Sequence, residues 1–146
     1  MEDLQVTTKV KLLKPTHEVF EAIVNPEEMA HYWFSSGSGR LEEGKTVTWR
    51  YEEYGAEVDI HVLELQKNKK IVYQWPAGEG TVVTITLKEV DHTSTIIEVV
   101  EKGWKENDED LMNILLGQKE GWVYMLTCLK GYLEHNVSTL RASLVF

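Results

Sequence analysis

Apolar and polar residues alternate with a period of two from about Thr46 to Lys102. This is the pattern of strands that bury one face. Short turns, at Tyr54–Gly55 and Gly78–Gly80 among others, separate the alternating segments. Strands joined by short turns pair in antiparallel fashion, because parallel pairing needs long crossover connections. The region therefore predicts an antiparallel meander, and a slip of the alternation at Val62–Leu63 predicts a bulge within it.

A second pattern, with the period of a helix, follows the strands and predicts one long C-terminal helix. Asn107–Asp110 is expected to open this helix, and Gln118 interrupts its apolar face. A helix with so long an apolar face must lie across the sheet, so we expect the amide of Gln118 to point inward. The apolar positions are Leu111, Ile114, Leu115, Trp122, Met125, Leu126, Leu129 and Leu133.

The N-terminal part of the chain changes pattern twice. Residues 6–12 alternate as a strand, and residues 19–24 then show helical spacing. Asn25–Pro26 supplies an N-cap and a first-turn proline for a second short helix over residues 27–32. Ser35–Gly39 has the composition of a loop.

These elements predict an α+β fold, in which a curved antiparallel β-sheet carries two short helices and a long C-terminal helix packed across it. The 146 residues suffice for one domain with a sizeable core, so residues 1–146 are predicted to form a single domain. The tail over residues 136–146 is expected to be loosely ordered.

Composition excludes several classes of partner. The net charge is −9, and no stripe of Lys and Arg could displace the counterions of a nucleic acid or bind an anionic membrane. No apolar segment has the length of a membrane span. The single cysteine, Cys128, lies beside the apolar stripe of the last helix and is expected to be a small buried hydrophobe. One cysteine and an acidic N-terminus fit a cytoplasmic protein.

Candidate catalytic groups are few. The histidines lack metal-ligand spacing, and the serines lack the strand–turn–helix context of a nucleophile. We therefore assign no catalytic residue, metal or cofactor, and favour a binding protein over an enzyme. Glu98, flanked by Ile96, Ile97, Val99 and Val100, is the one acid whose context could turn it inward. The more frequent alternative is that Glu98 faces solvent, because unpaired carboxylates are rarely buried.

The aromatic residues suggest a cavity. Tyr51 and Tyr73 lie on the apolar side of predicted strands, and Trp122 faces them from the helix. Such aromatics usually form a solid core, but two tyrosines and Gln118 on one face are more polar than a core tolerates. The residues expected to line the cavity are Trp33, Trp49, Tyr51, Ile60, Tyr73, Trp75, Val83, Ile85, Leu115, Gln118 and Trp122.

The order of motifs resembles a known family. The matching segments are Pro15 with Val19–Ile23, Asn25–Glu27, Tyr32–Trp33, Glu43–Lys45, Lys70–Trp75, Gly121–Trp122, Leu126, Leu129 and Tyr132–Glu134. Together they resemble the START-like (SRPBCC, birch-pollen-allergen-like) helix-grip fold. More narrowly, they resemble the family homologous to the C-terminal domain of the activator of heat-shock-protein-90 ATPase. The resemblance implies a cavity between sheet and C-terminal helix for hydrophobic or aromatic molecules, but no reaction, because one fold hosts many functions.

Three functions are therefore carried forward. The leading hypothesis is binding of a hydrophobic, aromatic or lipid-like small molecule between sheet and helix. The second is a protein-interaction module that acts as a chaperone cofactor, by analogy with the eukaryotic activator. The third is a cyclase or hydrolase that uses Glu98 with a tyrosine hydroxyl. A filled core between helix and sheet would favour the second over the first.

Overall fold

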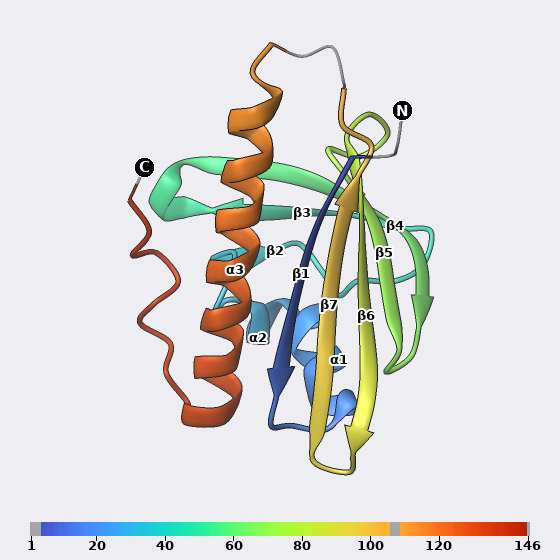
Figure 1. Cartoon of the computed structure of the whole chain (residues 1–146), viewed down its shortest axis with the longest axis vertical. Coiled ribbons are helices and arrows are strands. Elements are labelled where there is room, and N and C mark those ends of the chain that lie inside the picture. Colours follow the sequence, from blue (N-terminus) through green and yellow to red (C-terminus); the bar gives the residue numbers. More distant parts are fainter. Residues whose placement is uncertain (1–3, 106–108, 146) are drawn as a thin grey trace.

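One curved antiparallel sheet forms the frame of the molecule (Figure 1). The structure is a computed structural model and describes residues 4–105 and 109–145. Within these residues the sheet has seven strands in the order β1-β7-β6-β5-β4-β3-β2. The predicted meander is confirmed, and the first strand pairs with the last. The strands are β1 (Gln5–Leu12), β2 (Ser36–Gly37), β3 (Thr46–Tyr51), β4 (Ala56–Gln66), β5 (Lys70–Trp75), β6 (Thr81–Asp91) and β7 (Ser94–Lys102).

Two local features shape the sheet. The register of β4 against β5 shifts between Val62 and Glu64, which confirms the predicted bulge. The expected loop at Ser35–Gly39 contains the short strand β2, which pairs with β3 through Gly37 and Trp49. A Cβ on Gly37 would lie 3.1 Å from the Trp49 side chain, so the glycine lets β2 approach the core closely.

Two short helices follow β1, as predicted. They are α1 (Thr16–Val24) and α2 (Pro26–Met29), and a short 3₁₀ helix, η1 (Glu52–Tyr54), joins β3 to β4. The Asn25 side chain accepts a hydrogen bond from the Glu27 backbone N–H at 3.0 Å, which caps α2 as expected. The buried side chains of α1 and α2 extend the core beneath the sheet.

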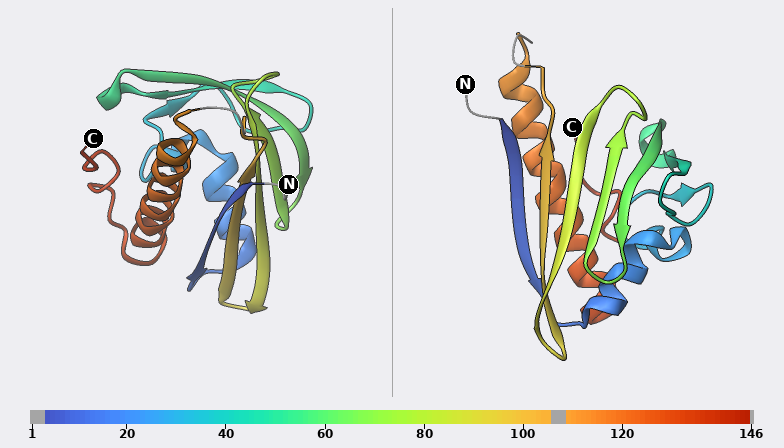
Figure 2. Two further views of the ribbon diagram at one scale, coloured as in Figure 1. Left: turned by 45° about the horizontal axis from the view of Figure 1, so that its top comes forward. Right: turned by 90° about the vertical axis from the view of Figure 1, so that its right-hand side faces the viewer.

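The long helix α3 (Leu111–His135) lies across the concave face of the sheet (Figure 2). Asn107 and Asp108, which we expected to open it, lie outside the described residues. Asp110 is the N-cap residue, and its carboxylate accepts a hydrogen bond from the Asn113 side chain instead of from the backbone.

The predicted apolar face of α3 is packed in only one of its halves. In the C-terminal half the side chains of Trp122, Met125, Leu126, Cys128 and Leu129 are buried. In the N-terminal half, Leu111, Ile114, Leu115 and Gln118 are half-buried at most. The N-terminal half of α3 therefore packs less closely against the sheet than the C-terminal half does.

The free edge of β1 is covered by side chains of α3. Lys119 donates to the backbone oxygen of Thr7, and Lys130 donates to that of Lys11 at 2.9 Å. At the end of the strand, the backbone N–H of Leu13 donates to Glu134 at 3.0 Å. At the other edge of the sheet, β2 has only two residues. No helix in the described part of the chain has the length and apolar character needed to cross a membrane.

Candidate ligand-binding groove

Glu101, near the end of β7, is a carboxylate held inside the protein with 1% of its surface exposed. One oxygen accepts from the amide of Gln118 at 2.9 Å and from the indole N–H of Trp122 at 2.8 Å. The other accepts from the indole N–H of Trp75 at 2.9 Å and from the hydroxyl of Thr81. The four donors come from β5, β6 and α3, so this one side chain joins three strands of the sheet to the helix.

The inward-facing acid is thus Glu101 and not Glu98. Glu98 forms an ion pair with Lys9 at 3.3 Å, and about a third of its side chain is exposed. Strand alternation explains the difference, because Ile97, Val99 and Glu101 share one face of β7 and Glu98 lies on the other. The favoured expectation, that Glu98 faces solvent, is therefore confirmed. The alternative of an inward Glu98 with an acid–base role is wrong.

Two adjoining hollows lie along α3 between Ile114 and Met125, the outer one beside Glu101, and we call them together the α3 groove. The inner hollow has a volume of about 190 Å³ and the outer hollow one of about 430 Å³. Trp75 and Gln118 line both. The walls of the inner hollow include Tyr32, Trp33, Tyr51, Tyr54, Trp122 and Tyr124. Those of the outer hollow include Phe34, Pro76, Glu101, Trp104 and Ile114.

The residues expected to line a cavity fall into two groups. Five of them line the inner hollow: Trp33, Tyr51, Trp75, Gln118 and Trp122. Five others are at most 1% exposed and belong to the core: Trp49, Ile60, Tyr73, Val83 and Ile85. Leu115 is half-buried and packs against this core. The structure therefore brings part of the expected set to the groove and leaves the rest beneath it.

Aromatic rings fill much of the space that we expected to be open. The ring of Trp49 lies 4.9 Å from that of Trp33 and 5.5 Å from that of Tyr73. Trp75 and Trp122 are 5.5 Å apart and form the floor of the inner hollow. These are the separations of packed aromatic pairs. The space between helix and sheet is therefore a solid aromatic core with a groove along its upper side.

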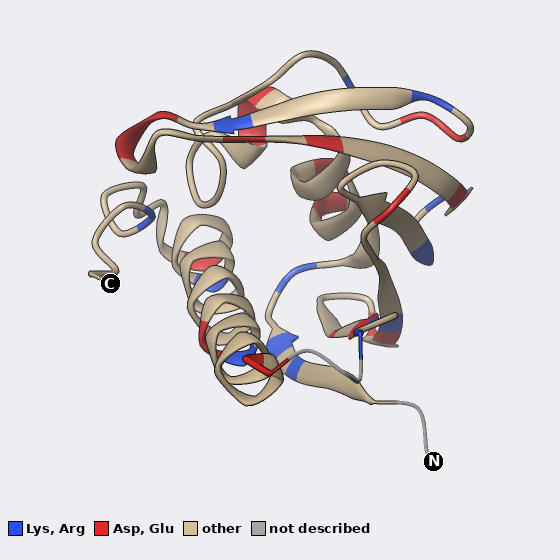
Figure 3. Cartoon of the chain, turned by 90° about the horizontal axis from the view of Figure 1, so that it is seen from above, with Lys and Arg blue, Asp and Glu red and all other residues tan. Residues whose placement is uncertain are grey.

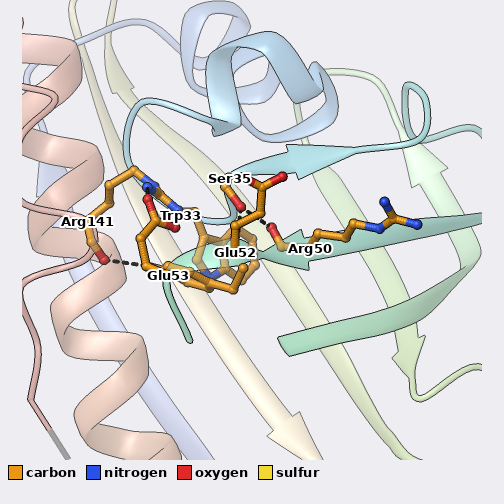
Figure 4. A network of polar contacts seen from close by, with 7 residues as sticks. Trp33, Ser35, Arg50, Glu52, Glu53 and Arg141 are labelled. Carbon is orange, nitrogen blue, oxygen red and sulfur yellow. Dashed lines mark hydrogen bonds and ion pairs between the residues drawn. The ribbon is translucent and has the colours of Figure 1, made fainter. Parts of the chain in front are cut away.

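The C-terminal tail lines one end of the inner hollow through Arg141 and Leu144, and Figure 4 shows Arg141 beside Trp33 and Glu53. Arg141 binds both carboxylate oxygens of Glu53 and donates to the backbone oxygen of Trp33 at 2.7 Å. Its guanidinium lies 4.8 Å from the ring centre of Tyr51, whose hydroxyl donates to the Arg141 backbone oxygen. The bonds from Arg141 hold the pKa of Glu53 below its ordinary value, and burial raises the pKa of Tyr51 to about 12.

Further contacts hold the same region. The hydroxyls of Tyr54 and Tyr124 donate to tail backbone oxygens, each at 2.7 Å. Behind the β3–β4 turn, Ser35 donates to the backbone oxygen of Arg50 and accepts from the Glu52 backbone N–H (Figure 4). The tail, which we expected to be loosely held, thus makes specific contacts with the tyrosines of the groove.

Tyr73 carries a buried polar atom without a partner. Its side chain is fully buried, and its hydroxyl is the one buried side-chain polar atom without a hydrogen bond in the described part of the chain. Burial raises the pKa of Tyr73 well above its ordinary value. Tyr32 is also fully buried, but its hydroxyl donates to the Ala22 backbone oxygen at 2.8 Å.

The remaining candidates for chemistry are the thiol of Cys128 and groups of side chains that could bind a metal. Cys128 is 2% exposed, and burial raises the pKa of its thiol, as expected of a small buried hydrophobe. Within the described residues, no three side chains of His, Cys, Asp or Glu gather as metal ligands would.

A family profile for "Activator of Hsp90 ATPase homolog 1-like protein" matches residues 14–134. The chain belongs to this family. Among solved structures, it shares 43% identity and a TM-score of 0.82 with protein SSP2350 of Staphylococcus saprophyticus, over 94% of this chain and 97% of that one. A comparison with curated proteins gave no match.

More distant members of the fold are similar in shape. The Aha1 dimer of Colwellia psychrerythraea is 20% identical, with a TM-score of 0.76 over 90% of this chain and 97% of that one. DynU16, from the dynemicin biosynthetic locus, is 21% identical, with a TM-score of 0.83 over 97% of this chain and 51% of that one. These matches confirm the helix-grip fold of this Hsp90-activator homologue.

Replacing Glu101 tests its role in joining the sheet to α3. Glu101→Gln keeps the shape but places an amide nitrogen, itself a donor, where two donors now meet. We expect the free energy of unfolding to fall by about 2–4 kcal/mol, because buried donors lose their acceptor. Urea denaturation followed by circular dichroism measures this change. The matched control Glu98→Gln loses an exposed ion pair, worth about 0–1 kcal/mol. Equal losses in the two variants would contradict the assignment.

The two buried tyrosines give a second comparison. Tyr32→Phe removes a buried hydrogen bond and is expected to lower the free energy of unfolding by about 1–2 kcal/mol. Tyr73→Phe removes an unpaired hydroxyl, so we expect no loss, or a gain of up to about 1 kcal/mol. Thermal and urea denaturation of both variants measure these effects. A loss in Tyr73→Phe as large as that in Tyr32→Phe would show that the Tyr73 hydroxyl has a bound partner in solution.

Proposed function

We propose that this Hsp90-activator homologue binds a small, flat, hydrophobic molecule in the α3 groove. The observation that carries the proposal is a pair of adjoining hollows with walls of aromatic rings, which lie along α3 between Ile114 and Met125 and share Trp75 and Gln118 as wall residues. Pockets for small molecules are concave, mostly apolar and supplied with a few polar groups. The groove has this composition, and Gln118 lies at the junction of its two parts.

The dimensions of the groove limit the ligand. Ligand pockets commonly have volumes of about 300–1,000 Å³, and the inner hollow alone, at about 190 Å³, is smaller than this range. The outer hollow, at about 430 Å³, lies within it. A ligand that spans both hollows would pass Trp75 and the Gln118 amide, which Glu101 holds in one orientation. Flat rings suit such a passage because they stack on the aromatic walls.

The fold neighbours support the proposal in general terms. DynU16, one protein of this fold, lies in the dynemicin biosynthetic locus. Its ligand, if any, is a property of that protein. The ligand of this chain has to be inferred from the residues of its own groove.

Nuclear magnetic resonance of the tryptophan indole N–H groups tests the proposal. The probes are a panel of flavonoids, hydroxylated naphthalenes and medium-chain fatty acids. We expect a bound probe to shift the signals of Trp75 and Trp122, which line the groove, and to leave that of Trp49, which is 1% exposed, in place. Trp49 is therefore an internal control. The absence of binding by every probe of this panel and by small aromatic amines, or shifts confined to residues outside the groove, would refute the proposal.

Two glycines of α3 allow a matched blocking experiment. Gly121 lines the inner hollow and Gly117 does not, and a Cβ on either would meet no atom within 4 Å. Both Gly→Leu substitutions favour the helix by similar amounts. We expect Gly121→Leu to fill the hollow and abolish probe binding, while Gly117→Leu binds as the unmodified protein does. Equal binding by both variants would place the ligand elsewhere.

A second function is favoured by the aromatic core that fills much of the space between helix and sheet, and by an exposed face of α3. Met112, Leu116 and Val123 are 68%, 61% and 44% exposed, and at 100° per residue they lie within about 40° of one another. Such an exposed apolar stripe is typical of a protein-binding surface. The family to which the chain belongs bears the name of an Hsp90 ATPase activator. The second candidate is therefore docking of this stripe on an Hsp90-type chaperone.

The ATPase rate of an Hsp90-type chaperone, with and without this protein, tests the second function. If the stripe docks, the protein should raise the rate, and Leu116→Glu should remove the effect because it places a charge in an apolar contact. Leu63→Glu is the matched control, since Leu63 is exposed on β4. An unchanged rate with the unmodified protein would eliminate this candidate.

A further inference from the structure

Glu101 has no ion-pair partner within the described residues. Its four donors are two indoles, an amide and a hydroxyl, all of them neutral. A buried charge without an opposite charge is expensive, even when hydrogen bonds satisfy its lone pairs. A positive charge brought near Glu101 would therefore be stabilised.

The outer hollow lies beside this buried charge. Glu101 lies on its wall together with the aromatic side chains of Phe34, Trp75 and Trp104. The indole N–H of Trp104 donates to the backbone oxygen of Glu101 at 3.3 Å, which holds this ring against the end of β7, on the wall that it shares with Glu101. Aromatic faces attract cations because their π-systems are negative. A buried carboxylate among aromatic walls is a combination suited to an organic cation.

The charged residues around the outer hollow also favour a cation. The second acidic residue on its wall, Glu57, is paired with Arg50 at 2.6 Å, and none of its lining residues in the described chain is Lys or Arg. Lys105 lies on the adjoining hollow beyond Trp104. Over the whole molecule acidic residues exceed basic ones, and the β3–β4 turn near the groove carries several of them (Figure 3). A net charge of −9 attracts cations from a distance.

Arg141, at the far end of the inner hollow, is the group that would attract an anion instead. Its guanidinium already binds both oxygens of Glu53 and the backbone of Trp33. Its charge is thus neutralised inside the protein, whereas that of Glu101 is not. The unbalanced charge of the groove is negative.

We propose that the ligand of the α3 groove is a small organic ammonium ion with a flat apolar body, whose cationic end lies in the outer hollow between Trp104 and Glu101. This inference rests on the proposed small-molecule function and specifies its ligand class. The apolar body lies along Trp75 and Gln118 toward the inner hollow. Recognition is by charge and by the aromatic faces, since the oxygens of Glu101 already accept four hydrogen bonds.

Three probes of nearly equal shape and different charge test the inference: phenethylamine, phenethyl alcohol and hydrocinnamate. At neutral pH the first is a cation, the second is neutral and the third is an anion. Titrations followed through the indole signals of Trp75 and Trp104 give each dissociation constant. We expect the cation to bind at least about tenfold more tightly than the alcohol, and the anion more weakly than both.

Variants separate the contributions of the Trp104 ring and the Glu101 carboxylate to binding of the amine. Trp104→Leu keeps an apolar wall but removes the aromatic face, so we expect it to weaken binding of the amine about three- to fivefold more than binding of the alcohol. Glu98→Gln is the control for a carboxylate on the same strand that lies outside the groove and is paired with Lys9, and it should leave the preference for the amine unchanged. Glu101→Gln, where it folds, should reduce the preference to near unity.

The outcomes distinguish the inference from the function on which it rests. If the alcohol or the anion binds at the groove as tightly as the amine, the cation inference fails while small-molecule binding stands. If flavonoid, naphthol, fatty-acid and phenethyl probes all fail to bind, the proposed function fails. A preference for the amine that survives Trp104→Leu unchanged would also overturn the proposed site.

Discussion

The hydrogen bonding of one buried carboxylate determines how α3 sits on the sheet. Glu101 accepts from Trp75, Thr81, Gln118 and Trp122, and so ties β5, β6 and β7 to the helix. The indole groups of Trp75 and Trp122 pack against neighbouring rings and also donate hydrogen bonds to Glu101. Because Gln118 and Trp122 are anchored here, the helix cannot settle further onto the sheet at this point. The outer hollow has Glu101 and Gln118 on its wall, so it lies directly beside this anchor.

The sequence predicted the elements and their order because periodicity reports which face of an element is buried. It also placed Gln118 inward, although the expected neighbours were Tyr51 and Tyr73 and the actual partner is Glu101. Glu101 was missed because residues 96–100 are all apolar except Glu98, which hides the alternation of β7. Counting in steps of two from Ile97 through Val99 would have placed Glu101 on the buried face.

The size of the cavity could not be predicted in the same way. Periodicity assigns Trp49, Tyr73 and Trp75 to one face, but the depth to which their rings fill the space depends on their packing against Trp33 and Trp122. The part that the tail takes in lining the inner hollow was equally hidden. Arg141 reaches Glu53 and Trp33 across 88 and 108 positions of sequence, and no local pattern encodes such contacts.

Two lysines of α3 bond to the backbone of β1, so the helix also covers an edge of the sheet. An exposed edge strand offers its backbone groups to strands of other molecules, and here Lys119 and Lys130 occupy two of the carbonyl oxygens on that edge. Another chain could extend the sheet at β1 only by displacing these side chains. The helix that roofs the groove therefore also keeps the protein from joining others edge to edge, so a movement of α3 away from the sheet would weaken its resistance to aggregation.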